Sequence, residues 1–147
     1  MTRAVKVPVT IENIDGDGYH IFTTLEIEKI PFRALIDTGA SKTVVSNTAM
    51  VQLKEASVLA QPATMAKGLG SQELTTGILL LKSIRLGKIK IESLLVGQLD
   101  LSHITLAYNG LGIQPFDVIL GGDLLVQYQA VINYEKMWMK LKFNPEY

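Results

Sequence analysis

The chain contains no cysteine, and this absence excludes several kinds of chemistry. Without thiols it can form no disulfide, present no thiolate nucleophile and hold no zinc or iron-sulfur centre through sulfur. It has two histidines, His20 and His103, which stand far apart and lack a second ligand at metal-binding spacing. We therefore expect neither a metal nor a cofactor, and interpret each histidine as a surface or capping residue.

The chain has no excess of positive or negative charge, because Lys plus Arg and Asp plus Glu each total 14. Such a chain has no net field to draw it onto nucleic acid or anionic lipid. Long hydrophobic runs are also missing: apolar stretches such as Ile78 to Leu81 fall far short of the ~20 residues that span a bilayer. Neither nucleic acid nor a membrane is an expected partner.

The first residues, Met1 to Pro8, alternate polar and apolar side chains and lack the uninterrupted apolar core of a signal peptide. We expect a soluble, cytoplasmic protein that is not secreted. The composition, 48% hydrophobic and 19% charged, suits a packed core and not a disordered chain. No linker rich in proline, glycine or serine divides the chain, so residues 1–147 are expected to form one domain.

Most of the sequence alternates apolar and polar residues with a period of two, the pattern of β-strands. Val5 to Ile11 and Ile21 to Ile27 are two such stretches, so residues 1–27 are predicted to form an N-terminal hairpin extension. Asp15-Gly-Asp-Gly18 between them favours a tight turn, since these residues tolerate positive φ. A calcium loop is the alternative, but the segment lacks the remaining oxygen ligands and the closing glutamate.

The rest of the chain predicts an all-β fold with one or two short helices. Strand patterns cover Phe32 to Ile36, Thr43 to Ser46, Ile78 to Leu86, Lys88 to Ile91, Ser93 to Val96, Asp117 to Gly122, and a closing hairpin of Ala130 to Tyr134 and Met137 to Phe143. Gly87 and Gly97 are expected to break the strands between Ile78 and Val96 and after Val96. Apolar residues at helical spacing follow a Ser46 or Asn47 cap, and Asp123 to Gln129 can form two helical turns.

The segment Ala34-Leu-Ile-Asp-Thr-Gly-Ala-Ser41 places Asp37 on a turn between two apolar strands. A carboxylate there is held by rigid backbone, Gly39 permits another chain to approach closely, and Thr38 can hydrogen-bond across that approach. Asp-Thr-Gly is also an ordinary turn sequence, so the three residues alone do not establish a site. The context strengthens it, because Val118-Ile-Leu-Gly121 precedes a second short helix further along the chain.

Asp37-Thr-Gly39 followed by Ile119-Leu-Gly121 resembles the retropepsin-like aspartic proteases. The resemblance extends from about Ile27 to the closing hairpin and implies their single-lobe acid protease β-barrel fold. In that family the Asp-Thr/Ser-Gly turn holds the catalytic carboxylate, and an apolar-apolar-Gly strand lies beside it. The resemblance therefore implies that Asp37 is catalytic and that Thr38 and Gly39 support the active site.

Between these two motifs lies a glycine-rich segment, Gly68-Leu-Gly-Ser-Gln72, at the position of the family's flap. A flap closes over bound peptide and excludes water. The resemblance thus implies that Gly68, Leu69, Gly70 and Ser71 contact substrate. An ordinary hairpin loop with glycines is the alternative interpretation.

Only one Asp-Thr/Ser-Gly sequence occurs in the chain, whereas aspartic protease chemistry requires two carboxylates facing one water. The resemblance therefore implies a symmetric homodimer in which two Asp37 side chains meet on the two-fold axis. Such a pair shares one proton: the ionised carboxylate accepts a proton from the water, and the protonated one donates to the substrate carbonyl. The expected activity is that of an aspartic endopeptidase acting on a peptide or protein substrate.

Two positions near the motifs carry residues with consequences for this interpretation. Ala40, and not a serine, follows Gly39, so a hydroxyl that could stabilise the ionised carboxylate is absent and activity should extend closer to neutral pH. Gly122 stands where many family members carry an arginine, so dimer contacts should be organised differently. Asp117 and Asp123, which bracket this strand, are expected to hold local geometry and not to take part in catalysis.

Other interpretations stay open. A binding or scaffolding module could keep this fold without cleaving anything, because fold alone does not determine function. Retention of Asp37-Thr-Gly39 favours the protease, since two like charges held together destabilise a dimer and are worth keeping mainly for chemistry. The chain could also be a self-processing fragment of a longer polyprotein.

Overall fold

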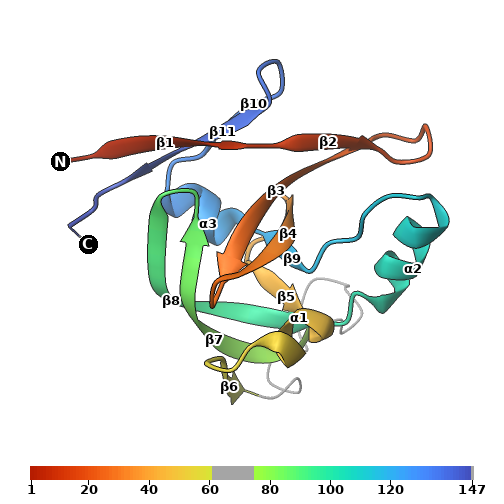
Figure 1. Cartoon of the computed structure of the whole chain (residues 1–147), viewed down its shortest axis with the longest axis horizontal. Coiled ribbons are helices and arrows are strands. Elements are labelled where there is room, and N and C mark those ends of the chain that lie inside the picture. Colours follow the sequence, from red (N-terminus) through yellow and green to blue (C-terminus); the bar gives the residue numbers. More distant parts are fainter. Residues whose placement is uncertain (61–74, 147) are drawn as a thin grey trace.

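The structure is a computed structural model, and the residues it describes are 1–60 and 75–146. Most of these residues form strands, joined by a few short helices (Figure 1). The strands are β1 (Arg3–Pro8), β2 (Thr10–Asn13), β3 (Tyr19–Ile27), β4 (Ile30–Ile36), β5 (Val44–Ser46), β6 (Ser57–Ala60), β7 (Thr75–Leu86), β8 (Ile89–Leu99), β9 (Val118–Leu120), β10 (Val131–Asn133) and β11 (Trp138–Phe143). The helices are α1 (Asn47–Gln52), α2 (Ser102–Gly110) and α3 (Gly122–Gln127).

The larger sheet has the strand order β2-β3-β4-β9-β5-β8-β7-β6. β3 also pairs with β7, through Glu26 opposite Arg85 and Ile27 opposite Ile84, and this pairing closes the strands from β3 to β7 into a barrel. β9 runs parallel to β4 on one side and antiparallel to β5 on the other. The all-β barrel fold predicted from the sequence is confirmed.

The alternating N-terminal stretch was expected to be one strand, but it forms two strands that belong to different sheets. β1 pairs with β11 in a small sheet of order β1-β11-β10, with Arg3 opposite Phe143 and Pro8 opposite Trp138. β2 pairs with β3 in the barrel sheet. Figure 1 shows β1 and β2 as one extended ribbon along the top of the molecule, so this ribbon connects the two sheets.

The turn predicted between β2 and β3 is present, and its backbone has the predicted conformation. Ile14 N donates to Gly18 O at 2.8 Å, and the Asn13 side chain accepts from Gly16 N at 2.8 Å. Asp15 and Gly16 have φ of 51° and 73°, the left-handed region that Asp and Gly tolerate. The closing hairpin of β10 and β11 is likewise confirmed.

The main hydrophobic core fills the barrel. Burial alternates along β4, where Phe32, Ala34 and Ile36 are buried and the residues between them are more exposed. The paired strands β7 and β8 contribute Leu79 and Val96, which lie opposite each other and are both fully buried. The period-two pattern in the sequence therefore marks the core-facing side of these strands.

Two features of the second half differ from the sequence-based expectations. β8 does not break at Gly97, because Gly97 pairs with Ile78 of β7 and with Val44 of β5. α2 was not predicted at all. Its residue Tyr108 is buried against Phe22 in a second, smaller apolar cluster, so tertiary packing stabilises the helix where its sequence does not.

Both short helices that were predicted are present. Ser46 is the N-cap of α1, and its hydroxyl accepts a hydrogen bond from Ala49 N at 2.9 Å. α3 begins at Gly122, directly after the strand β9. In the parts of the chain that the structure describes, no helix is long and apolar enough to cross a membrane.

Replacing Leu79 by alanine should lower the free energy of unfolding by about 2–5 kcal/mol, because the side chain is fully buried in the barrel and its loss leaves a cavity. The matched control is Leu95→Ala on β8, where the side chain is 44% exposed. We expect that control to lose less than about 1 kcal/mol. Urea unfolding followed by circular dichroism measures both losses, and equal values would contradict the placement of Leu79 in the core.

Candidate active site

Asp37 follows β4 directly, on the turn that leads to β5. Its backbone N donates to Leu120 O of β9 at 3.0 Å, and its backbone O accepts from Ala40 N at 3.1 Å. The side chain is half-buried, and Oδ1 accepts a hydrogen bond from Gly39 N at 2.9 Å. The turn therefore orients the carboxylate through backbone contacts while leaving it accessible.

The two predicted support residues, Thr38 and Gly39, are exposed at the tip of this turn. A Cβ at Gly39 would lie 3.3 Å from Asp37 Oδ1, closer than an ordinary contact, so a side chain there would crowd the carboxylate. Thr38 has no hydrogen-bond partner within residues 1–60 and 75–146. Its role as a brace across a dimer interface stays a prediction.

The backbone around Gly121 supports the Asp37 turn from the side. Gly122 N donates to Ala40 O at 2.7 Å, and Asp123 N donates to Ser41 O at 3.2 Å. A Cβ at Gly121 would lie 2.5 Å from the carbonyl carbon of Lys42 and 2.9 Å from Ala40 O. Both neighbours are backbone atoms that cannot move aside, so glycine is required at this position.

A buried hydroxyl joins the two segments. Thr43 is 2% exposed, and its Oγ1 donates to Asp123 Oδ1 at 2.7 Å and accepts from Gly121 N at 3.1 Å. Thr43 N and Leu124 N donate to the same aspartate oxygen, at 3.0 and 2.9 Å. Asp123 thus holds local geometry, as expected from the sequence. Thr43 was not identified from the sequence as a residue of this site. The one feature of the sequence that pointed to such a role was its hydroxyl at the start of an apolar strand.

The other end of β9 is fixed in the same manner. Ser46 Oγ donates to Asp117 Oδ1 at 2.7 Å, and Ser46 N donates to Asp117 O at 2.8 Å. Asp117 is therefore structural, as expected. Both flanking aspartates accept hydrogen bonds from buried hydroxyls, whereas in the described part of the chain the Asp37 side chain accepts only from Gly39 N. Asp37 differs from the other two because its side chain is not hydrogen-bonded to a neighbouring strand within the described residues.

The predicted flap residues Gly68, Leu69, Gly70 and Ser71 lie outside the residues that the structure describes, so their contact with substrate stays a prediction. β6 and β7, which flank this segment in the sequence, pair antiparallel, with Val58 opposite Leu79. Within residues 1–60 and 75–146, no group of three or more His, Cys, Asp or Glu residues is placed to hold a metal ion.

A family model described as Aspartyl protease matches residues 23–124. The match covers more than half of the chain and includes the Asp37 turn, β9 and the beginning of α3. The chain therefore belongs to the aspartyl protease family.

Similar proteins occur in two Xenopus species. Protein DDI1 homolog 2 from Xenopus laevis is 24% identical over 122 residues, which is 82% of this chain and 28% of the relative. The Xenopus tropicalis protein of the same name is also 24% identical over 122 residues, 82% of this chain and 27% of its own. The chain thus spans less than a third of the length of these curated relatives.

Solved structures of retropepsin-like proteases share the fold. A retropepsin-like aspartic protease from Rickettsia conorii superposes with a TM-score of 0.57 at 14% identity, covering 97% of this chain and 94% of that chain. The retroviral protease-like domain of Ddi1 from Leishmania major superposes with a TM-score of 0.51 at 17% identity, covering 78% and 81% of the two chains. The resemblance to retropepsin-like proteases seen in the sequence is confirmed at the level of fold and family.

Replacing Thr43 by valine should lower the free energy of unfolding by about 1–3 kcal/mol. The variant lacks the buried hydroxyl that accepts from Gly121 N and donates to the Asp123 carboxylate, so both groups lose a hydrogen-bond partner. Thr24→Val, at an exposed position of β3, is the matched control and should change stability by less than about 0.5 kcal/mol. Urea midpoints of the two variants test this, and a Thr43→Val protein as stable as its control would refute it.

Gly121→Ala should destabilise the protein by about 3 kcal/mol, since the added methyl group collides with backbone that cannot relax. The amides of Asp37 and Gly122, whose partners are Leu120 O and Ala40 O, should exchange faster with solvent. Gly110→Ala in α2 serves as the control, because a Cβ there meets nothing within 4 Å. Hydrogen exchange read by NMR decides the matter, and indistinguishable variants would disprove the close approach at Gly121.

Proposed function

We propose that this protein is an aspartic endopeptidase that works as a symmetric homodimer. The observation that carries the proposal is the half-buried Asp37 carboxylate, oriented by Gly39 N on a turn that β9 holds in place. One chain supplies one such carboxylate, and hydrolysis by this chemistry needs two facing one water. A second copy of the chain therefore completes the site.

In the proposed mechanism the two Asp37 carboxylates share one proton, because two like charges this close do not both ionise. The ionised carboxylate accepts a proton from the water as the water oxygen forms a bond to the peptide carbonyl carbon. The protonated carboxylate donates its proton to the carbonyl oxygen. When the tetrahedral intermediate breaks down, the C–N bond breaks and the leaving amine takes up the proton that the first carboxylate accepted from the water. A hydroxyl of the intermediate returns a proton to the second carboxylate as the product carboxylic acid forms, so the pair again holds one proton.

The proposed substrate is a peptide segment in extended conformation. Extended peptide gains main-chain hydrogen bonds at strand edges, and its alternate side chains enter pockets. Gly68, Leu69, Gly70 and Ser71 would cover the bound segment and exclude water from the carboxylates. Family membership and the likeness to the Rickettsia conorii protease support this proposal.

Wild-type protein should cleave a mixture of random peptides between pH 4 and 7, whereas Asp37→Asn should lose about 10²–10⁴-fold in rate, because an amide cannot accept the proton of the attacking water. Mass spectrometry of the products gives both the rates and the preferred sequences.

The rate should fall on either side of the pH at which the pair holds one proton. Since Ala40 offers no hydroxyl, activity should extend toward neutral pH, and a profile confined below about pH 4 would contradict this part.

Asp17→Asn, at an exposed position of the β2–β3 turn, is the matched control and should retain wild-type rates. Circular dichroism and sedimentation velocity verify that each variant is folded and dimeric. If the intact wild-type dimer cleaves nothing, the proposal fails and the fold serves as a peptide-binding or scaffolding module instead.

A further inference from the structure

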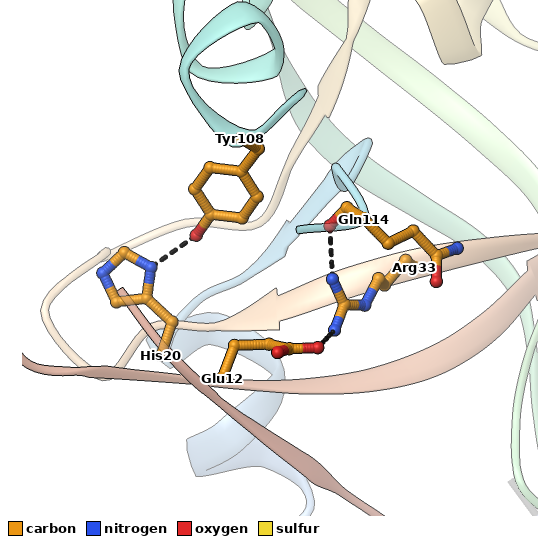
Figure 2. A network of polar contacts seen from close by, with 5 residues as sticks. All are labelled: Glu12, His20, Arg33, Tyr108 and Gln114. Atoms are coloured by element: carbon orange, nitrogen blue, oxygen red, sulfur yellow. Dashed lines mark hydrogen bonds and ion pairs between the residues drawn. The ribbon is translucent and has the colours of Figure 1, made fainter. Parts of the chain in front are cut away.

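A polar network connects β4, the strand that leads to Asp37, with the segment that precedes β9 (Figure 2). Arg33 lies on β4, upstream of Asp37, and its guanidinium forms an ion pair with Glu12 Oε1 of β2 at 2.8 Å. The other terminal nitrogen of Arg33 donates to the backbone carbonyl of Gln114, in the linker between α2 and β9. Figure 2 shows Arg33 reaching both partners at once.

The guanidinium of Arg33 is held in one position. Its side chain is 11% exposed, and its central carbon lies 3.9 Å from the centre of the Phe22 ring. Phe22 is fully buried in the smaller apolar cluster, where it contacts Phe116. Because a charge at this depth is costly without its partners, loss of Glu12 or of the Gln114 carbonyl would disturb the whole arrangement.

A second contact fixes the same region. The hydroxyl of Tyr108 on α2 is hydrogen-bonded to His20 Nδ1 on β3, as Figure 2 also shows. Burial raises the pKa of the Tyr108 hydroxyl above its ordinary value. α2 and the linker that follows it are therefore attached to β2, β3 and β4 at two places.

The backbone of Arg33 begins the ladder that ends at Asp37. Arg33 O accepts a hydrogen bond from Asp117 N at 3.1 Å. The pairs between β4 and β9 follow in order, from Ala34 opposite Val118 to Ile36 opposite Leu120. The next contact is Asp37 N to Leu120 O at 3.0 Å. A continuous series of backbone contacts therefore runs from Arg33 along β9 to Asp37.

We propose that Arg33 is a positioning residue for Asp37, acting through the linker and β9. β9 has three residues, and the linker that Arg33 contacts leads directly into it, so a shift of the linker would be passed on to the short strand that holds Asp37 N. This inference rests on the proposed peptidase function, in which two carboxylates must be placed accurately on one water. A misplacement of about 1 Å at such a site can cost about 10²-fold in rate.

The test compares Arg33→Met, which keeps the apolar stem and removes the charge and donors, with Arg33→Lys, which can keep one of the two polar contacts. Arg85→Met is the matched control, because the ion pair of Arg85 with Glu26 is longer, 3.8 Å, and exposed. For protein verified as folded and dimeric, kcat should fall about tenfold in Arg33→Met and by less in Arg33→Lys, with KM changed less than about twofold. Arg85→Met should match the wild type.

Hydrogen exchange in the Asp37→Asn background gives a readout that does not need activity. The amides of residue 37 and Gly122 should exchange about tenfold faster with Arg33→Met than with Arg85→Met. Unchanged exchange at these amides overturns the inference whether or not the wild type cleaves peptide. A kcat equal to that of the wild type also overturns it and would make Arg33 a stabilising residue only.

Discussion

The structure depends on the close approach between the backbone at Gly121 and the chain from Ala40 to Lys42. A single added carbon at Gly121 would lie 2.5 Å from the Lys42 carbonyl carbon. Because no side chain separates the two segments, β9 can pair with β4 on one side and β5 on the other. That double pairing completes the barrel and also holds Asp37 N against Leu120 O. The contact that closes the fold is therefore the contact that places the carboxylate.

Three aspartates lie within this small region, and their surroundings give them different roles. Asp123 accepts from the buried Thr43 hydroxyl and from backbone amides, and Asp117 accepts from Ser46, which also caps α1. Those hydrogen bonds attach both carboxylates to the chain from Thr43 to Ser46, which contains β5. Asp37 instead accepts from a backbone amide of its own turn, so in the described part of the chain its side chain is not attached to a neighbouring strand as the other two are.

Most of the barrel and the Asp37 turn could be predicted from the sequence, because their signals are local. The alternation along β4 and the glycine at the end of β9 lie within a few residues of what they specify. α2 could not be predicted, since its stability comes from Tyr108 packing on Phe22, a residue remote in the chain. The continuation of β8 through Gly97 likewise depends on partners from β5 and β7. Contacts of this kind leave no periodic trace in the segment they stabilise.

The small sheet also determines how the molecule responds to a mechanical load. Arg3 and Phe143 are opposite each other, so the two ends of the described chain leave the fold side by side. A force that draws these ends apart opens the β1–β11 ladder one pair at a time from Arg3 and Phe143, instead of shearing all pairs together. The barrel bears that load only after Pro8 and Trp138 have separated. The small sheet thus separates before any of this load reaches the barrel strands on either side of Asp37.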